Sequence, residues 1–196
     1  MFQIRIHGRG GQGVVTAAEM LSVAAFEGGR HAQAFPSFGS ERTGAPVVAY
    51  CRIDDREIRL REPILQPDAL IIQDPTLLHQ VDVFGGLRNS GYVLINTTRS
   101  FAELGLGEFA QRFPADHLLT VPATELARKH VGRPVPNVPL LGAFAALGGL
   151  VSLEAVHKAI ADKFSGKVAA GNQAAATEAF EFVMAQERRA QEMHHA

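Results

Sequence analysis

The first thirty residues combine two hydrophobic periods separated by glycines. Residues 2–7 alternate apolar and polar side chains, which predicts a short strand. Beyond the glycines, apolar side chains recur three and four residues apart from about Gly13 to Glu27, which predicts an amphipathic helix ended by Gly28 and Gly29. The chain therefore opens as strand, glycine turn and helix, the start of a βαβ unit.

Short apolar runs predict the remaining strands. Residues 46–53 and 57–60 flank three polar residues, which predicts a β-hairpin. Residues 69–73 and 92–96 are typical of buried strands in a mainly parallel sheet. The segment 31–43 has no clear periodicity and is expected to be an ordered loop after a short strand. The alternation of strands and helices predicts a Rossmann-like α/β fold with a hairpin insertion.

From about Pro122 the pattern becomes helical. The expected helices lie near residues 123–131, 140–150, 153–164 and 168–189. The proline-rich stretch 133–139 is expected to connect two of them, and the polar end of the chain, from about Gln186, is expected to fray. We interpret residues 1–196 as a single domain with a helical C-terminal region at about 122–190.

Composition narrows the class of protein. The chain has 196 residues, of which 46% are hydrophobic and 20% charged, as in ordinary globular domains. The formal net charge of -1 argues against nucleic acid as the main partner. No apolar run approaches the roughly 20 residues of a membrane span. We therefore expect a cytoplasmic protein that does not enter a membrane.

The chain lacks the side chains of a metal centre. Cys51 is the single cysteine, so the sequence offers neither an internal disulfide nor the four thiolates that usually hold an iron–sulfur cluster. The eight histidines form no H-E-x-x-H pattern. His7 follows the first strand and is interpreted as structural, and His194 and His195 belong to the tail.

The glycine turn is the first candidate site. Gly8, Gly10 and Gly13 form G-x-G-x-x-G between the predicted strand and helix, where backbone N–H groups and the helix N-terminus can hold a phosphate. Arg9 is a possible cationic contact. The alternative is that the glycines only allow the strand and helix to pack closely.

A nicotinamide site requires one more residue than this sequence supplies. Such sites use an Asp or Glu at the end of the second strand, about 20 residues beyond the glycines. The segment after Arg30 contains no acid, and Glu41 comes late, within the loop. Arg30 leaves a 2′-phosphate contact open, but the pattern argues against a conventional NAD site.

A second candidate lies in residues 38–46. Here Glu41 and Arg42 stand between Gly39 and Gly44, just before a predicted strand. The pair can bond locally to neighbouring helices. Alternatively, Arg42 can present its planar guanidinium to a carboxylate, a phosphate or another subunit.

The two candidate sites lie in segments that resemble a known protein family. GRGGQGVVTAAEML (residues 8–21) followed by QAFPSFGSERTGAPVVAYCRI (residues 33–53) resembles the gamma subunit of the pyruvate and 2-oxoisovalerate ferredoxin oxidoreductase family. The resemblance continues through residues 66–78, 92–97 and 137–147 and ends near Gln186.

This resemblance implies that the chain is part of an enzyme that oxidatively decarboxylates a 2-oxoacid to an acyl-coenzyme A and passes the electrons to ferredoxin or another acceptor. It implies alpha, beta and delta-type partner subunits, which would hold thiamine diphosphate, magnesium and iron–sulfur clusters. The gamma chain itself would hold none of these, and would help to bind coenzyme A and to assemble the hetero-oligomer.

The resemblance also selects residues for these roles. The expected lining of a ligand or subunit groove is the backbone of Gly8, Arg9, Gly10, Gly11, Gln12 and Gly13, and Ser40, Glu41 and Arg42 are expected at an interface near the active site. Phe35 and Phe38 are candidates for stacking on an adenine, and Asn137 for ligand contact, although packing and helix capping are the simpler interpretations.

Two other hypotheses remain open at this stage. The chain can be a scaffold whose glycine turn packs against a partner without touching a cofactor. It can also be a stand-alone NAD(P)-binding oxidoreductase, which the missing acid disfavours.

Overall fold

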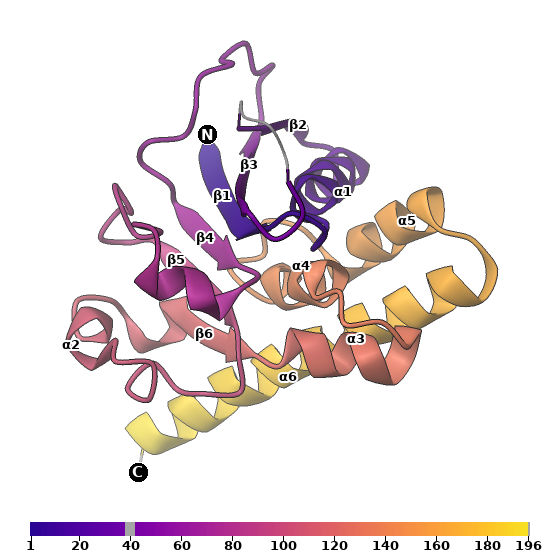
Figure 1. Ribbon diagram of the computed structural model, residues 1–196. Coiled ribbons are helices and arrows are strands. Elements are labelled where there is room, and N and C mark those ends of the chain that lie inside the picture. The colour runs from indigo at the N-terminus through magenta and orange to yellow at the C-terminus, as the bar shows by residue number, and fades with distance from the viewer. Residues whose placement is uncertain (38–41, 196) are drawn as a thin grey trace.

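The computed structural model describes residues 1–37 and 42–195 (Figure 1). Its elements follow one another as β1 (Phe2–Arg9), α1 (Val14–Glu27), β2 (His31–Pro36), β3 (Pro46–Asp54), β4 (Ala69–Ile72), η1 (Pro75–His79), β5 (Tyr92–Asn96), α2 (Gly107–Ala110), η2 (Ala115–His117), β6 (Leu118–Val121), α3 (Ala123–Val131), α4 (Asn137–Ala145), α5 (Leu153–Lys163) and α6 (Gly166–His194). None of the described helices is both long and apolar enough to cross a membrane.

The strands form one six-stranded sheet in the order β2-β3-β1-β4-β5-β6. Strands β1, β4, β5 and β6 pair in parallel, whereas β3 is antiparallel to both of its neighbours, β1 and β2. Strand β3 is therefore the single strand of this sheet that runs against the others. The α/β prediction of a mainly parallel sheet with a helical C-terminal part is confirmed.

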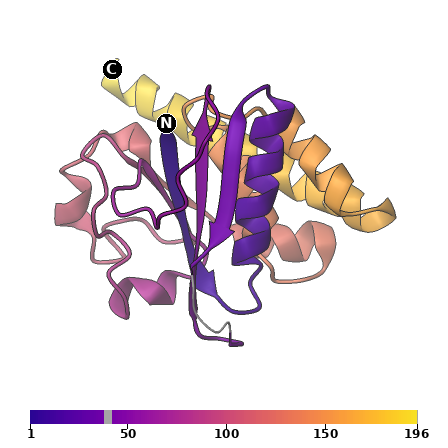
Figure 2. The ribbon, with the colours of Figure 1, turned by 90° about the horizontal axis from the view of Figure 1, so that it is seen from above.

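The two faces of the sheet are covered differently (Figure 2). One face packs against α1 and the C-terminal helices in a large apolar core that includes Ile4, Leu21, Cys51 and Phe144. The other face carries a smaller core, built by β4 and β5 and by the irregular segments that follow them. Helices therefore cover one side, and mostly loops cover the other.

The predicted hairpin was wrong in its pairing. Residues 46–54 do form a strand, but it pairs with β1 and β2, and residues 57–60 lie outside any strand. The apolar side chains of β3, such as Cys51 and Ile53, join the large core, whereas most of residues 57–60 are exposed. A strand without a buried face has little to hold it in a sheet, so the antiparallel insertion is the β2–β3 pair instead.

Three further differences concern element limits. Strand β6 was not predicted, because its four residues lie next to the polar turn η2 and offer almost no periodicity. Helix α4 begins at Asn137 and ends at Ala145, three to five residues before the expected limits. Helix α6 ends at His194, five residues beyond the expected limit, since its last turns are rich in helix-forming Ala, Gln, Glu and Arg.

Helices α4 and α6 touch backbone to backbone at one point. A Cβ atom built on Gly142 would lie 2.1 Å from the carbonyl oxygen of Ala176. Gly142 belongs to a helix that is buried along its whole length. The absence of a side chain at this position therefore sets the distance between the two helices.

Replacing Gly142 with alanine should destabilise the chain by about 1–3 kcal/mol, because the added methyl group must push α6 away from α4. The free energy of unfolding, measured by denaturant titration, checks this. Gly107→Ala is the matched control, since its Cβ would meet nothing closer than 4.0 Å, and it should leave stability unchanged or slightly raised. Equal stability of the two variants would contradict the packing argument.

Candidate functional site

The glycine turn lies at the topological switch point of the sheet. Strand β1 connects through α1 on one face, whereas β4, its parallel neighbour, continues into the segment on the other face. Ligand sites of open α/β sheets occur where connections diverge in this way, outside the carboxyl ends of the strands. The turn from Gly10 to Gly13 stands at that position, between the end of β1 and the start of α1.

The second predicted motif lies directly against the first. Gly10 donates its N–H to the carbonyl of Ala45 at 2.9 Å and accepts from the N–H of Gly44 at 3.0 Å. A Cβ atom on Gly10 would come within 2.1 Å of the carbonyl oxygen of Arg42. The two segments therefore meet backbone to backbone, although about thirty residues separate them.

Part of this junction is exposed to solvent. Gly11, with a φ of +91°, and the neighbouring Arg42, Thr43 and Gly44 are exposed. The prediction for Ser40 and Glu41, like that for Phe38, concerns residues outside the described part of the chain. Of the predicted charged pair, the structure thus places Arg42 beside the glycine turn.

The Arg9 side chain is occupied by the protein itself. Its guanidinium donates to the Asp74 carboxylate at 3.2 Å, to the Gly44 carbonyl at 3.1 Å, to Thr76 Oγ1 at 2.8 Å and to Gln80 Oε1 at 2.7 Å. It therefore clamps the turn to the segment after β4. A direct role of this side chain on a phosphate would require breaking several of these bonds.

Asp74 is the residue that holds this network together. One carboxylate oxygen accepts from Arg9 and from Gln12 Nε2, and the other accepts from the N–H and hydroxyl of Thr76. Burial alone would raise the pKa of Asp74, but the hydrogen bonds from Thr76 and Gln12 and the charge of Arg9 outweigh it, so the pKa is lowered. Sequence reasoning missed Asp74, although Asp-Pro-Thr after a buried strand is an N-cap signal.

Two glutamines connect the turn to the sheet. Gln12 Oε1 accepts from the backbone N–H of Arg9 at 2.8 Å, and the Gln12 carbonyl accepts from Gln73 Nε2 at 2.8 Å. Gln73 is only 1% exposed, and its Oε1 has no hydrogen-bond partner within the described chain. The predicted site residue Gln12 thus acts through its side chain as a brace inside the turn.

The glycines of the turn are needed for packing. A Cβ on Gly8 would lie 2.5 Å from Val14, and one on Gly13 would lie 2.4 Å from Asn137 Nδ2. Asn137 Nδ2 donates to the Gly13 carbonyl at 3.3 Å. The structure therefore supports close packing, the alternative interpretation of the motif, at Gly8, Gly10 and Gly13. At Gly11, by contrast, a Cβ atom would meet nothing within 4 Å.

Two other sequence candidates have structural roles. His7 Nε2 lies 3.0 Å from Arg5 Nε, and burial, with the charge of Arg5, lowers the pKa of His7 to about 3. It stays neutral at physiological pH. The Phe35 ring lies 4.9 Å from that of Tyr50, with the Arg52 guanidinium 5.4 Å from its centre, so packing accounts for this aromatic residue.

The fold lacks the geometry of a conventional dinucleotide site. Such sites place the second strand next to the first, so that its terminal acid reaches the ribose. Here β3 stands between β1 and β2. Arg30, the candidate for a 2′-phosphate, is 2.7 Å from Asp55.

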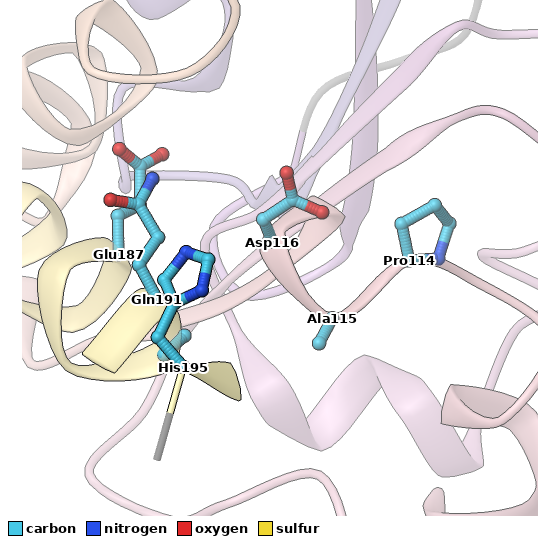
Figure 3. A pocket seen from close by; sticks show the side chains of 7 residues that line it. Pro114, Ala115, Asp116, Glu187, Gln191 and His195 are labelled. Carbon is cyan, nitrogen blue, oxygen red and sulfur yellow. The ribbon is translucent and has the colours of Figure 1, made fainter. Parts of the chain in front are cut away.

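A cavity of about 510 Å³ lies elsewhere, at the C-terminal end of α6. Figure 3 shows Glu187, Gln191 and His195 at the end of α6, across this cavity from Asp116. Burial and the charge of Asp116 raise the pKa of Glu187. No group of three or more potential metal ligands occurs among the residues that the structure describes.

Replacing Asp74 with asparagine should lower the free energy of unfolding at pH 7 by about 1–3 kcal/mol, because the new amide group meets the N–H donors of Arg9 or Gln12. The lowered pKa means that Asp74 stabilises the fold above its unfolded pKa, near 3.9, and that this contribution is lost as pH falls through the folded value. The difference between the two proteins should therefore shrink below about pH 4. Denaturant titrations across this pH range check both points.

Asp55→Asn is the control for this prediction. Asp55 also pairs with an arginine, but its side chain is 81% exposed, so its removal should change stability little. An Asp74→Asn protein that is as stable as this control would show that the network does not hold the turn.

Comparisons with known proteins assign the chain to a family. The sequence pattern of the family described as pyruvate ferredoxin/flavodoxin oxidoreductase matches residues 3–182. The gamma subunit common to the pyruvate and ketoisovalerate oxidoreductases of Thermococcus litoralis is 48% identical over 181 residues, which cover 92% of this chain and 96% of that one.

Solved structures agree with this assignment. The crystal structure of pyruvate oxidoreductase subunit PORC from Thermotoga maritima has a TM-score of 0.77 at 37% identity, over 92% of this chain and 95% of that one. A 2-oxoglutarate:ferredoxin oxidoreductase from Magnetococcus marinus shares the fold alone, with a TM-score of 0.71 at 19% identity over 94% of this chain and 30% of that one. The resemblance in the glycine turn and the following segment is thus confirmed, and the chain belongs to the pyruvate ferredoxin/flavodoxin oxidoreductase family, as a chain of the gamma type.

Proposed function

We propose that this chain is the gamma subunit of a hetero-oligomeric 2-oxoacid oxidoreductase that converts a 2-oxoacid and coenzyme A to an acyl-coenzyme A and carbon dioxide. Alpha, beta and delta-type partners would hold thiamine diphosphate, magnesium and iron–sulfur clusters. This chain would help to assemble the complex and to bind coenzyme A. The observation that carries the proposal is the match over nearly the full length of separate gamma subunits.

Similarity to a shared subunit and this chain's own residues support this division of labour. The Thermococcus litoralis subunit is common to two oxidoreductases that differ in substrate, which supports placing the choice of 2-oxoacid in other subunits. Cys51 is fully buried, and burial raises the pKa of its thiol to about 12. One protonated, inaccessible thiol does not suit a cluster that needs four thiolates, which supports clusters in partner chains.

Support for coenzyme A contact comes from the backbone at the switch point. The described chain offers no hydrogen-bond acceptor to the N–H groups of Gly11, which is exposed, and Gly13, which is half-buried, so these two donors before α1 can meet a phosphate. The exposed Arg42 lies beside them. Since the Arg9 guanidinium is engaged by Asp74, we propose that Arg42, together with this backbone, meets the coenzyme. The Magnetococcus marinus enzyme was solved with coenzyme A and succinyl-coenzyme A bound.

A second candidate function is that of a scaffold without cofactor contact. It is favoured by the packing of Gly8, Gly10 and Gly13 and by the engagement of Arg9, which together give the motif a purely structural purpose. In that case the exposed residues at the junction would contact a partner subunit.

Purification of the complex from its own cells tests the subunit proposal. The tagged chain should co-purify anaerobically with other chains that bring thiamine diphosphate and iron, as measured by native mass spectrometry and metal analysis. The purified complex should reduce a viologen dye in a reaction that requires both a 2-oxoacid and coenzyme A. Recovery of the chain alone, with neither cofactor, would contradict the proposal.

Arg42→Ala tests the coenzyme contact within that complex. Loss of one charge-assisted contact should raise the KM for coenzyme A about tenfold and leave the KM for the 2-oxoacid unchanged. Arg128→Ala, which removes an exposed arginine from α3, is the control. If Arg42→Ala leaves both constants unchanged but weakens co-purification, the scaffold function is the correct one.

A further inference from the structure

A second cavity, of about 310 Å³, lies behind the glycine turn. Its lining comes from distant parts of the chain, namely Thr16, Val131, Arg133, Val135, Asn137, Lys163, Phe164, Val168 and Asn172. Its volume is at the lower end of the range for small-molecule sites. The cavity touches the described site only through Asn137, which binds the Gly13 carbonyl.

The lining divides into an apolar wall and a positive rim. Val131, Val135 and Phe164 are half-buried and supply the apolar wall. Arg133 and Lys163 are exposed, and neither has an ion-pair or hydrogen-bond partner within the described chain. No acidic side chain lines the cavity. The rim therefore carries two positive charges, of which Lys163 also lines a neighbouring cavity with Glu19 and Asp162.

The helix dipoles do not decide whether the cavity favours an anion or a cation. The first turns of α1, α4 and α6 reach the cavity through Thr16, Asn137 and Val168, and their dipoles favour an anion. The last residues of α3 and α5, Val131 and Lys163, bring two helix ends of the opposite sign. These partial charges largely offset one another, so the two side-chain cations determine the preference.

Two amides complete the polar part of the cavity. Asn137 is 6% exposed and Asn172 is 7% exposed, and both line the cavity. Asn172 Nδ2 donates to the Val168 carbonyl at 2.9 Å, which fixes the orientation of its amide. Buried amides held by the backbone provide oriented polar groups at little cost in side-chain entropy, as small-molecule sites commonly do.

We propose that this cavity binds a small organic phosphate, with the phosphate at Arg133 and Lys163 and an apolar group against Val131, Val135 and Phe164. A phosphomonoester carries a charge of about -1.5 to -2 at pH 7. It therefore matches the two cations of the rim better than a singly charged carboxylate ligand would. Arginine adds paired donors suited to phosphate oxygens. The site does not depend on the proposed role in the oxidoreductase.

Phenyl phosphate is the probe, because it joins a phosphomonoester to a compact ring. Calorimetric titration of the full chain, in the complex with which it purifies, should show binding that weakens as salt is raised. Benzoate and phenol, which keep the ring but reduce or remove the charge, should bind more weakly. The absence of phenyl phosphate binding at about 10 mM would overturn the proposal.

Variants locate the binding. Arg133→Gln combined with Lys163→Gln should weaken phenyl phosphate binding at least about tenfold, whereas Lys158→Gln, on the same helix α5 but outside the cavity, should leave it unchanged. Val135→Phe should fill the cavity and weaken phenyl phosphate more than inorganic phosphate. Equal affinity of the wild type and the double variant would also overturn the proposal.

Competition distinguishes two sources of the phosphate. If coenzyme A displaces phenyl phosphate from the wild type, and this competition is lost in the Arg133→Gln, Lys163→Gln variant, the natural ligand is a phosphate of the coenzyme. If phenyl phosphate binds and coenzyme A does not compete, the ligand is a separate phosphorylated metabolite. Both results support the site, and the KM assay of Arg42→Ala remains an independent test of the proposed function.

Discussion

The arrangement around the switch point depends on one half-buried carboxylate, that of Asp74. Asp74 follows β4 directly, and its two oxygens together accept four hydrogen bonds, from Arg9, Gln12 and Thr76. Those donors come from the end of β1, from the glycine turn and from η1. A single charge thus fixes the relative position of three segments, and the Arg9 clamp extends its effect to Gly44. Hydrogen bonds to a charged acceptor suit this purpose, because they are stronger and more directional than apolar contacts.

The antiparallel strand β3 explains why the second motif lies at the same place. Because β3 runs against β1, its first residue lies opposite the last residue of β1, in the register Arg9 to Pro46. The segment that enters β3 must therefore pass the glycine turn, and Gly10 lets the two backbones approach. A parallel strand at this position would have placed its beginning at the opposite edge of the sheet. The pairing of two distant motifs is thus a consequence of strand direction.

Local patterns in the sequence predicted much of the fold, and less of the site. The limits of α1, β4, β5 and α3 were predicted to within a residue or so, because each is a continuous run with a clear period and a glycine or proline boundary. Strand pairing was not predictable, since residues 57–60 look as strand-like as residues 31–36, and only burial in the tertiary fold separates them. The glycine motif located the turn, but Asp74 and the cavity behind Asn137 depend on contacts between residues more than sixty positions apart.

Helix α6 connects two regions that the rest of the fold keeps apart. It is 29 residues long, so it measures about 44 Å at 1.5 Å per residue. Its first turns line the 310 Å³ cavity and its last turns line the 510 Å³ cavity. The close contact of Gly142 with Ala176 lies between them. Because both cavities share this one helix, a displacement of α6 along its axis would alter the walls of both, and the close backbone contact at Gly142 leaves no room for α6 to move toward α4.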